Sequence, residues 1–501
     1  MDGRSTATGA DAAGGRPCLV AVSGSLARHD ARVLKAAGTA AAAGYRVVVV
    51  APSPSGRLEE EDRGGWTLLE VPVADRARQA ATRARTLGRL GYRDAEQARS
   101  ARAALEAAVA RATARPLHVR LLRARGWLVT RRTVVMRYRQ TRRLWAEPWA
   151  RPVVRQALRL PSVRDWRRLV PESLDLDEAF APVIEALDPD LLHSHDVQTV
   201  NVVAGIAARA AARGRTVRWI YDAHEHVPGL TTYSPDRLAG LIELETAFIR
   251  QADGVLTVCE PIADDLCHRF GLARRPTVVL NAPRLPDPGS PTPVGGRSLH
   301  VDAGLAPDVP VVVYSGKLDR DRGIDDLVGA LALLPPPVSV VLITDRSGSY
   351  LNAVRARAAA SGCADRLRTV GYVPPADLVG YLSEAAVGFA GFSRIGNHEV
   401  ALPNKFFDYL HAGVPMVVSD LRLLGPLVRE LRVGQVYPFG DARALASVIA
   451  LVLRERSRFL PALRDPQLRR TYSWQAQEPA LLDLYRQVLA APAASSVGNA
   501  R

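Results

Sequence analysis

The sequence predicts an α/β protein with two doubly wound parallel-sheet domains that face a cleft, and with a basic helical insert in the first domain. Short, almost continuously apolar runs alternate with helical segments, as expected of strands buried on both faces of a parallel sheet. The alternation stops at a proline- and glycine-rich stretch and then starts again. The chain has 501 residues, 48% of them hydrophobic, which is enough for two or three domains.

The first series of elements predicts an N-terminal domain over residues 17–285, preceded by a disordered tail at 1–16 that is rich in small residues. These elements enclose segment 73–170, whose composition is different. The expected strands lie at 18–22, 45–51, 190–193, 217–221, 254–258 and 277–280, and the expected helices at 32–43, 197–212, 238–251 and 262–270.

Residues 282–300 contain five prolines and three glycines, which predicts a linker at 286–300. A second series then predicts a C-terminal domain over 301–470. Because ligands bind at the carboxyl ends of the strands in such sheets, the cleft between the domains is the expected site. The strands of the second domain are expected at 309–315, 338–344, 367–371, 387–390 and 415–419.

The charge is distributed very unevenly. Lysine and arginine number 66 against 51 acidic residues, a net charge of +15, and segment 73–170 alone carries +19 from 25 arginines and six acidic residues. Only Lys35, Lys317 and Lys405 are lysines. In a chain so rich in arginine, a lysine is a candidate for a position that needs a compact ammonium group.

The insert at 73–170 mixes its arginines with aliphatic residues and tryptophan in an order compatible with amphipathic helices. Such helices suit an anionic membrane surface, where apolar burial and attraction to phosphate add. The alternative is a solvated helical hairpin whose apolar face packs on its own domain. Nucleic acid is not an expected partner, because no nucleic-acid-binding module accompanies the basic segment.

The four cysteines form no CxxC pair, the N-terminus lacks the pattern of a secretion signal, and no run of 18 apolar residues occurs. These features predict a reduced protein without a membrane-spanning helix. We expect a cytoplasmic protein, or one held peripherally on the inner face of the cell membrane by the insert.

The stretch Tyr314–Gly323 lies where the first strand of the second domain ends and a helix begins. Its glycines let the backbone approach a ligand, the helix start offers free N–H groups, and Lys317 and Arg322 add two cations. This combination suits a diphosphate. It matches neither a Walker loop nor a dinucleotide-binding loop.

A second motif, Ala401–Ser419, is expected to form a loop, a helix and a buried strand. Asn404 and Lys405 stand at the helix start, where an anion is favoured, and Asp408 follows one turn later. A carboxylate there can accept hydrogen bonds from paired ribose hydroxyls. The alternative is an Asn helix cap beside a surface lysine and aspartate.

Together these stretches resemble the retaining GT-B glycosyltransferases of family 4, over nearly the whole chain outside 73–170. Gly316-Lys317-Leu318 and Arg322-Gly323 match the stretch that holds the donor diphosphate in that family. The resemblance implies the GT-B architecture and transfer of a sugar, with retention, from a UDP- or GDP-sugar to an acceptor hydroxyl. It also implies that no cofactor and no metal are required, and that segment 471–501 crosses back to the first domain.

The resemblance also assigns roles to individual residues. It gives catalytic roles to His224, Lys317 and Arg322, with His224 as the cleft histidine that meets the transferred sugar. The donor side comprises Gly24, Ser25, Gly316, Val373, Glu399, Asn404, Lys405 and Asp408, and the acceptor side Arg32, His195 and Asp196.

One position departs from the family pattern, which has a glutamate eight places before the ribose-binding acid. Val400 stands there, and Glu399 is one place off. We expect Glu399 or the backbone around Asn397 to serve instead. The acid Asp408 is itself one methylene shorter than the usual glutamate.

Three alternatives to a glycosyltransferase remain from the residues. His193-Ser-His195 and His224-Glu-His226 form two HxH pairs that can bind metal, although we expect none. A GT-B-like epimerase or hydrolase would use the same diphosphate site without an acceptor. A catalytically silent scaffold would recruit partners through the insert. For an active transferase, the expected acceptor is a lipid-linked glycan or polysaccharide precursor at the membrane face.

Overall fold

The computed structural model of the protein describes residues 15–79, 165–231, 233–285, 297–344 and 348–492, together with residues 99, 100 and 103. Most of the predicted tail, of the basic insert at 73–170 and of the linker at 286–300 lies outside the described residues. No helix among the described residues is both long enough and apolar enough to cross a membrane.

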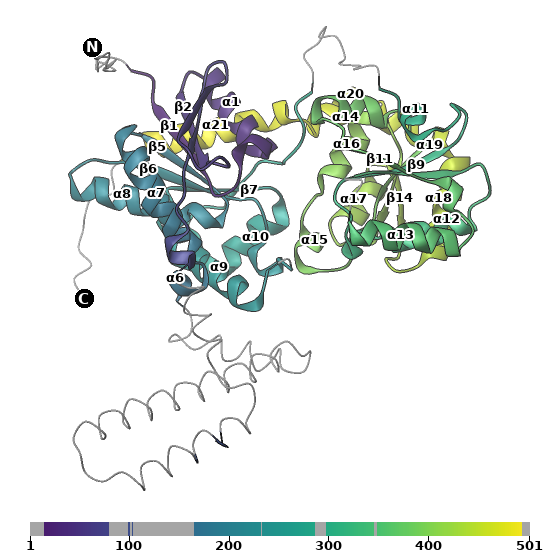
Figure 1. The fold of residues 1–501 in the computed structure, drawn as a ribbon. Coiled ribbons are helices and arrows are strands. Elements are labelled where there is room, and N and C mark those ends of the chain that lie inside the picture. Colours follow the sequence, from purple (N-terminus) through teal and green to yellow (C-terminus); the bar gives the residue numbers. More distant parts are fainter. Residues whose placement is uncertain are drawn as a thin grey trace, which may run out of the picture.

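The first domain is built on an eight-stranded sheet in the order β3-β4-β2-β1-β5-β6-β7-β8 (Figure 1). All its strand pairs are parallel except β3–β4. The prediction omitted β3 and β4. The strands are β1 (Cys18–Ser23), β2 (Arg46–Pro52), β3 (Glu59–Asp62), β4 (Thr67–Val71), β5 (Leu191–His195), β6 (Arg218–Ala223), β7 (Gly254–Thr257) and β8 (Thr277–Val278).

Helices cover both faces of this sheet, and each face has its own hydrophobic core. One core is formed with α7–α10, and the other with α1 and the C-terminal helix α21 (Trp474–Ala490). The helices of the first domain are α1 (Ala31–Ala42), α6 (Trp166–Leu169), α7 (Glu172–Ala186), α8 (Val200–Ala212), α9 (Pro235–Phe248) and α10 (Glu260–Phe270), with short 3-10 turns η1 (Ala27–His29), η4 (Val197–Thr199), η5 (Val227–Gly229) and η6 (Ile249–Gln251).

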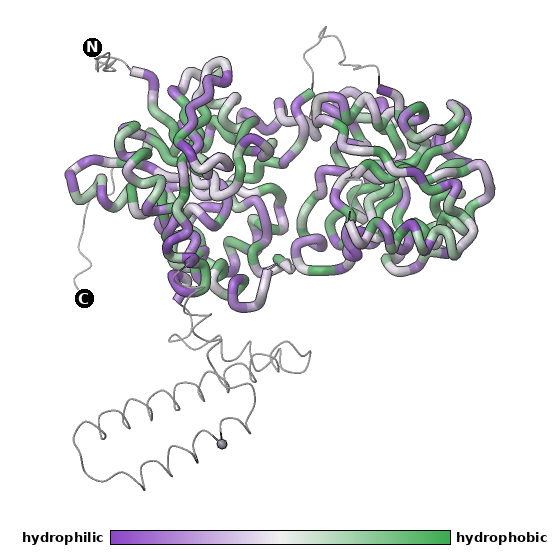
Figure 2. Tube along the Cα trace, viewed as in Figure 1, coloured by the Kyte–Doolittle hydropathy of each residue, from purple (hydrophilic) through white to green (hydrophobic). Residues whose placement is uncertain are grey.

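The second domain has a six-stranded sheet, parallel throughout, in the order β11-β10-β9-β12-β13-β14. Its central strands are mostly apolar, and the middle of this domain is mainly green in Figure 2. Two parallel-sheet α/β domains are therefore confirmed. The strands are β9 (Val311–Ser315), β10 (Ser339–Ile343), β11 (Leu367–Val370), β12 (Val387–Ala390), β13 (Met416–Ser419) and β14 (Gly434–Tyr437).

Helices pack on both sides of the second sheet (Figure 1). They are α11 (Leu299–Ala303), α12 (Ile324–Leu333), α13 (Ser349–Ala360), α14 (Pro375–Leu382), α15 (Gly396–Val400), α16 (Asn404–Ala412), α17 (Leu424–Glu430), α18 (Ala442–Arg454), α19 (Arg456–Leu463) and α20 (Pro466–Thr471), with 3-10 turns η7 (Arg320–Arg322) and η8 (Ala364–Arg366).

The chain passes between the domains twice, and the two passages are bonded to each other. Trp474 N–H donates to the Pro283 carbonyl at 2.8 Å, and its indole Nε1 donates to Thr39 Oγ1 of α1 at 2.8 Å. Trp474 is only 1% exposed. The second passage therefore ends in the core of the first domain, where α21 completes the cover of the sheet.

Candidate functional site

A cleft of about 580 Å³ lies between the domains and is lined by residues of both. The first domain contributes residues that follow the carboxyl ends of β1, β5 and β6. The second contributes the loop after β9 and the segment that leads into α16. This is the edge of each sheet at which a parallel α/β fold places its ligands.

The loop after β9 is shaped by glycine and bordered by cations. Gly316 has φ +128°, a backbone conformation that favours glycine, and a Cβ there would lie 3.0 Å from Lys405 Nζ. Lys317 and Arg322 both line the cleft, and Arg322 lies over the Phe392 ring at 4.8 Å. Neither cation forms an ion pair with any residue that the structure describes, so both are available to a bound anion.

The start of α16 lies beside this loop. Asn404 and Lys405 line the cleft, and Lys405 Nζ lies over the Tyr314 ring at 4.6 Å, where burial lowers its pKa to about 8. Asp408 follows one turn later, and burial raises the pKa of its carboxyl group to about 7, against the opposing effect of Lys405 and Lys35. Lys317, Arg322, Asn404 and Lys405 thus line one side of the cleft, whereas Asp408 and Gly316 are not among its lining residues.

Glu399 and Asn397 take different positions in α15. Glu399 Oε1 accepts a hydrogen bond from Arg394 Nε at 2.9 Å, and Oε2 accepts one from Arg422 N at 2.8 Å. Burial disfavours the charge of Glu399, but these bonds hold its pKa below the usual value. Asn397 lines the cleft. Glu399 is therefore bonded within its own domain, whereas Asn397 Oδ1 accepts a hydrogen bond from His226 N of the first domain at 3.0 Å.

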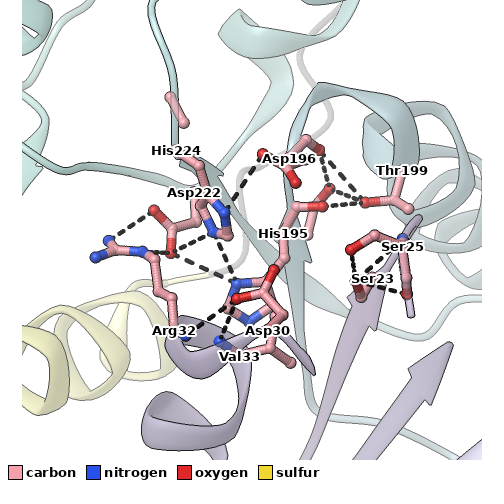
Figure 3. Close-up of polar contacts among 12 residues, drawn as sticks. Ser23, Ser25, Asp30, Arg32, Val33, His195, Asp196, Thr199, Asp222 and His224 are labelled. Atoms are coloured by element: carbon pink, nitrogen blue, oxygen red, sulfur yellow. Dashed lines mark hydrogen bonds and ion pairs between the residues drawn. The ribbon is translucent and has the colours of Figure 1, made fainter. Parts of the chain in front are cut away.

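A network of histidines and carboxylates forms the opposite side of the cleft (Figure 3). His195 of β5 lies next to Asp222 of β6 in the sheet register. Four nitrogens surround Asp222 Oδ2: Arg32 Nε at 2.8 Å, His224 Nε2 at 3.3 Å, His193 Nε2 at 3.5 Å and His195 Nδ1 at 3.6 Å. Sequence reasoning did not single out Asp222, although D-x-H at a strand end places both residues on one face.

Arg32 is held in this network by the start of α1. Asp30 Oδ1 accepts from Arg32 N at 3.0 Å and from Val33 N at 3.2 Å, which caps the helix. The Arg32 side chain, 2% exposed, bonds both oxygens of Asp222 at 2.8 Å and the Val279 carbonyl at 2.7 Å. Its charge is therefore already matched inside the protein.

His224 is the histidine of this network that faces the cleft. Its Nε2 lies 3.1 Å from His195 Nδ1, and its Nδ1 lies 3.4 Å from Asp196 Oδ1. Burial opposes its charge, but Asp196 and Asp222 raise the pKa of His224 to about 9. Burial would raise the pKa of Asp222 too, yet Arg32 and His224 keep it well below the usual range. The cleft thus faces an imidazolium supported by buried carboxylate charge.

The other three histidines of the two HxH pairs, His193, His195 and His226, do not line the cleft. His193 and His195 are 0% exposed, and burial lowers the pKa of each, so both are neutral. His193 Nδ1 is 2.8 Å from Tyr485 Oη of α21. His226 Nε2 pairs with Asp265 at 3.2 Å. His195, predicted on the acceptor side, instead supports His224 from behind, whereas Asp196 lines the cleft.

Two sets of these residues have ligand atoms close enough for a metal ion, His193–His195–Asp222 and Asp30–Asp196–His224, each within 4.8 Å. In the first set Arg32 already occupies both oxygens of the carboxylate. In the second set the Asp30 carboxylate caps α1, and His224 is positively charged. These arrangements serve hydrogen bonding better than they serve a cation.

The other predicted donor residues lie at the edges of the site. Ser25 lines the cleft. Gly24 packs closely on η4, since a Cβ there would lie 3.1 Å from Gln198 Oε1. Val373 is 4% exposed and belongs to the core of the second domain.

The two halves of the chain match two family models. Residues 117–282 match the model described as Glycosyltransferase Family 4, and residues 309–455 match the model described as Glycosyl transferases group 1. Together the two matches cover more than half of the chain.

Individual relatives are more distant. The D-inositol 3-phosphate glycosyltransferase of Jonesia denitrificans is 28% identical over 205 residues, which are 38% of this chain and 45% of the relative. The phosphatidyl-myo-inositol mannosyltransferase of Mycobacterium leprae is 27% identical over 183 residues, 35% of this chain and 46% of the relative. The chain spans about half the length of the curated relatives it matches.

Solved structures show the same fold over nearly the whole chain. Sucrose-phosphate synthase from Thermosynechococcus elongatus superposes with a TM-score of 0.63 at 17% identity and covers 95% of this chain and 100% of its own. A glycosyltransferase from Rickettsia africae gives a TM-score of 0.58 at 11% identity, with 95% and 100% covered. From the family matches and this architecture, the chain belongs to family 4 of the glycosyltransferases and has the GT-B fold.

Proposed function

We propose that the protein transfers a glycosyl group, with retention, from a UDP- or GDP-sugar to a hydroxyl group of an acceptor. One observation carries this proposal. Two cations of the second domain without ion-pair partners among the described residues, Lys317 and Arg322, line the same cleft as the charged His224 of the first domain. A donor whose diphosphate lies on the cations then presents its sugar toward the histidine.

In this proposal the second domain holds the donor. Lys317 and Arg322 bind the diphosphate, with Lys405 beside the glycine loop, and Asp408 accepts hydrogen bonds from the ribose. As the glycosidic bond to the diphosphate breaks, negative charge grows on the leaving oxygens. Fixed cations at that position stabilise the transition state more than the ground state, which is the usual source of large catalytic effects.

The first domain supports the other end of the reaction. The Nδ1–H of His224, on the side of Asp196, can donate to a hydroxyl of the transferred sugar. Asp222, beside Nε2, keeps the ring protonated and oriented. Asp196 can accept a hydrogen bond from the incoming acceptor hydroxyl. In the retaining chemistry implied by the family, the acceptor attacks on the face that the diphosphate leaves, and the phosphate oxygen takes the acceptor proton. The proposal requires no cofactor and no metal.

For the acceptor, we propose a lipid-linked glycan or a polysaccharide precursor at the inner face of the cell membrane. Two relatives are named for an inositol phosphate and for a phosphatidyl-inositol, acceptors that carry phosphate. The insert at 73–170, with its charge of +19, has the composition to attract such an anionic surface. Flotation with anionic liposomes tests this part, and no salt-sensitive binding would contradict it.

The donor site is tested first by calorimetric titration with UDP and GDP. We expect micromolar binding of one nucleotide and its loss in Lys317→Ala, with Arg443→Ala, an exposed cation on α18 away from the cleft, as the control. Binding of neither nucleotide would contradict the proposal. Product analysis with the matching nucleotide sugars then separates transfer from the alternatives. Free or isomerised sugar without acceptor product would indicate a hydrolase or an epimerase, and no turnover a silent scaffold.

A further inference from the structure

The two domains touch at a second place, away from the chain passages, where η5 of the first domain meets α15 of the second. His226 N–H donates to Asn397 Oδ1 at 3.0 Å, and Cys259 Sγ lies 2.8 Å from the Val400 carbonyl. The side chain of Val400 packs against the core of the first domain. This contact therefore combines hydrogen bonds with apolar packing across the domain boundary.

Two glycines make this approach possible. A Cβ on Gly396 would lie 2.5 Å from Gly229 Cα, and a Cβ on Gly229 would lie 2.4 Å from Asn397 N. Neither glycine has a positive φ angle, so alanine fits the local backbone of each. What excludes a side chain at Gly396 is the backbone of the other domain, which cannot turn aside as a flexible side chain can.

The contact joins the two halves of the candidate site. On one side, His226 lies two residues after His224. On the other, Asn397 lines the cleft, and α15 leads directly into the start of α16 with Lys405. The distance between the cleft histidine and the donor side therefore depends on how closely η5 and α15 approach.

We propose that Gly229, Gly396 and Asn397 form a positioning contact that holds the two domains at the separation required for sugar transfer. Its role in catalysis rests on the proposed function. None of these three residues is among those proposed to hold the nucleotide, Lys317, Arg322 and Asp408. The contact sets the distance between donor and His224, so its loss should lower kcat and leave nucleotide affinity nearly unchanged.

The substitution Gly396→Ala tests the contact with one methyl group. To restore an ordinary carbon contact of ~3.5–4.0 Å, the domains must separate by roughly 1 Å. A displacement of that size between reacting groups lowers kcat on the order of 100-fold. Gly380→Ala in α14 is the matched control, because nothing lies within 4 Å of its added Cβ.

Cys259 gives a readout that does not depend on activity. Its side chain is 2% exposed beside Val400, and burial raises the pKa of its thiol to about 11, so it should react slowly with a maleimide while the contact holds. Cys18 and Cys363 are buried within their own domains, and Cys267, which is partly exposed, is replaced by serine in all variants.

We expect Gly396→Ala to label faster at Cys259 and to lose kcat, with unchanged calorimetric affinity for UDP or GDP, whereas Gly380→Ala matches the parent. Equal labelling and equal kcat in the two variants would overturn the proposal. If Gly396→Ala does not fold, Asn397→Ala, which removes only the bond from His226, decides by the same labelling. If the parent protein transfers no sugar, the proposed function fails, and Cys259 labelling alone still tests the contact.

Discussion

Replacing Asp222 by asparagine should remove the charge that keeps His224 protonated. The amide keeps the size of the carboxylate but cannot balance Arg32, which bonds both of its oxygens, or His224, 3.3 Å away. In the variant, the positive charges of Arg32 and His224 would lie close together and buried, with no carboxylate between them. The pKa of His224 should therefore fall toward or below its ordinary value of 6.5.

The size of the effect follows from the pKa of His224, which is raised from 6.5 to about 9. A group with a raised pKa in the folded state stabilises the fold fully below the unfolded value and loses this effect as the pH rises through the folded value. Such a shift contributes about 3 kcal/mol to the free energy of unfolding. The wild-type protein should lose that much stability between about pH 6.5 and pH 9.

Urea unfolding across this pH range, combined with NMR titration of His224, measures both quantities. Asp222→Asn should be less stable by ~3–5 kcal/mol at low pH, because it leaves a buried charge unpaired, and its stability should depend less on pH. Asp253→Asn is the control. It weakens the ion pair between Asp253, just before β7, and Arg218 of β6, 2.7 Å apart, and this pair includes no histidine. Titration of His224 near 6.5 in the wild type, or an equal pH slope in Asp222→Asn, would refute the reasoning.

Three further predictions concern the donor side and the fold. Lys317→Ala should lower kcat/KM roughly 30- to 1000-fold, equivalent to ~2–4 kcal/mol of transition-state stabilisation, and an unchanged value in steady-state assays would contradict its role. Since the Asp408 carboxyl has a pKa of about 7, calorimetric affinity for UDP or GDP should increase as the pH rises through that value, and less steeply in Asp408→Asn. Trp474→Ala should lower the free energy of unfolding, measured with urea, by ~3–5 kcal/mol, because it leaves a cavity in the core of the first domain. The exposed-site control Leu333→Ala should change stability by no more than ~0.5 kcal/mol.

Much of the fold could be predicted because its strands are buried on both faces and are therefore almost purely apolar. β1, β2, β9 and β10 all have this character. β3 (Glu59–Asp62) was not predicted, because it is an edge strand of four acidic residues whose side chains alternate between half-buried and exposed. Without an apolar residue it carries no periodic signal, and only its pairing with β4 makes it a strand.

The site was predictable where its residues are close in sequence and not where they meet through the fold. The loop with Lys317 and Arg322 and the helix with Lys405 were found from local motifs. The bond from Arg32 to Asp222 spans 190 positions, and no local pattern indicates it. The same holds for Asn397, whose bond to His226 spans 171 positions and depends on how two separate domains approach.

The double passage of the chain between the domains limits how the protein can be dissected and how it can move. Trp474 and α21 complete the sheet of the first domain, so a fragment that ends before the second passage would leave an apolar face uncovered. The bond from Trp474 N–H to the Pro283 carbonyl also joins the two passages where they reach the first domain. We therefore expect the cleft to open by rotation of one domain about a single axis close to Pro283 and Trp474.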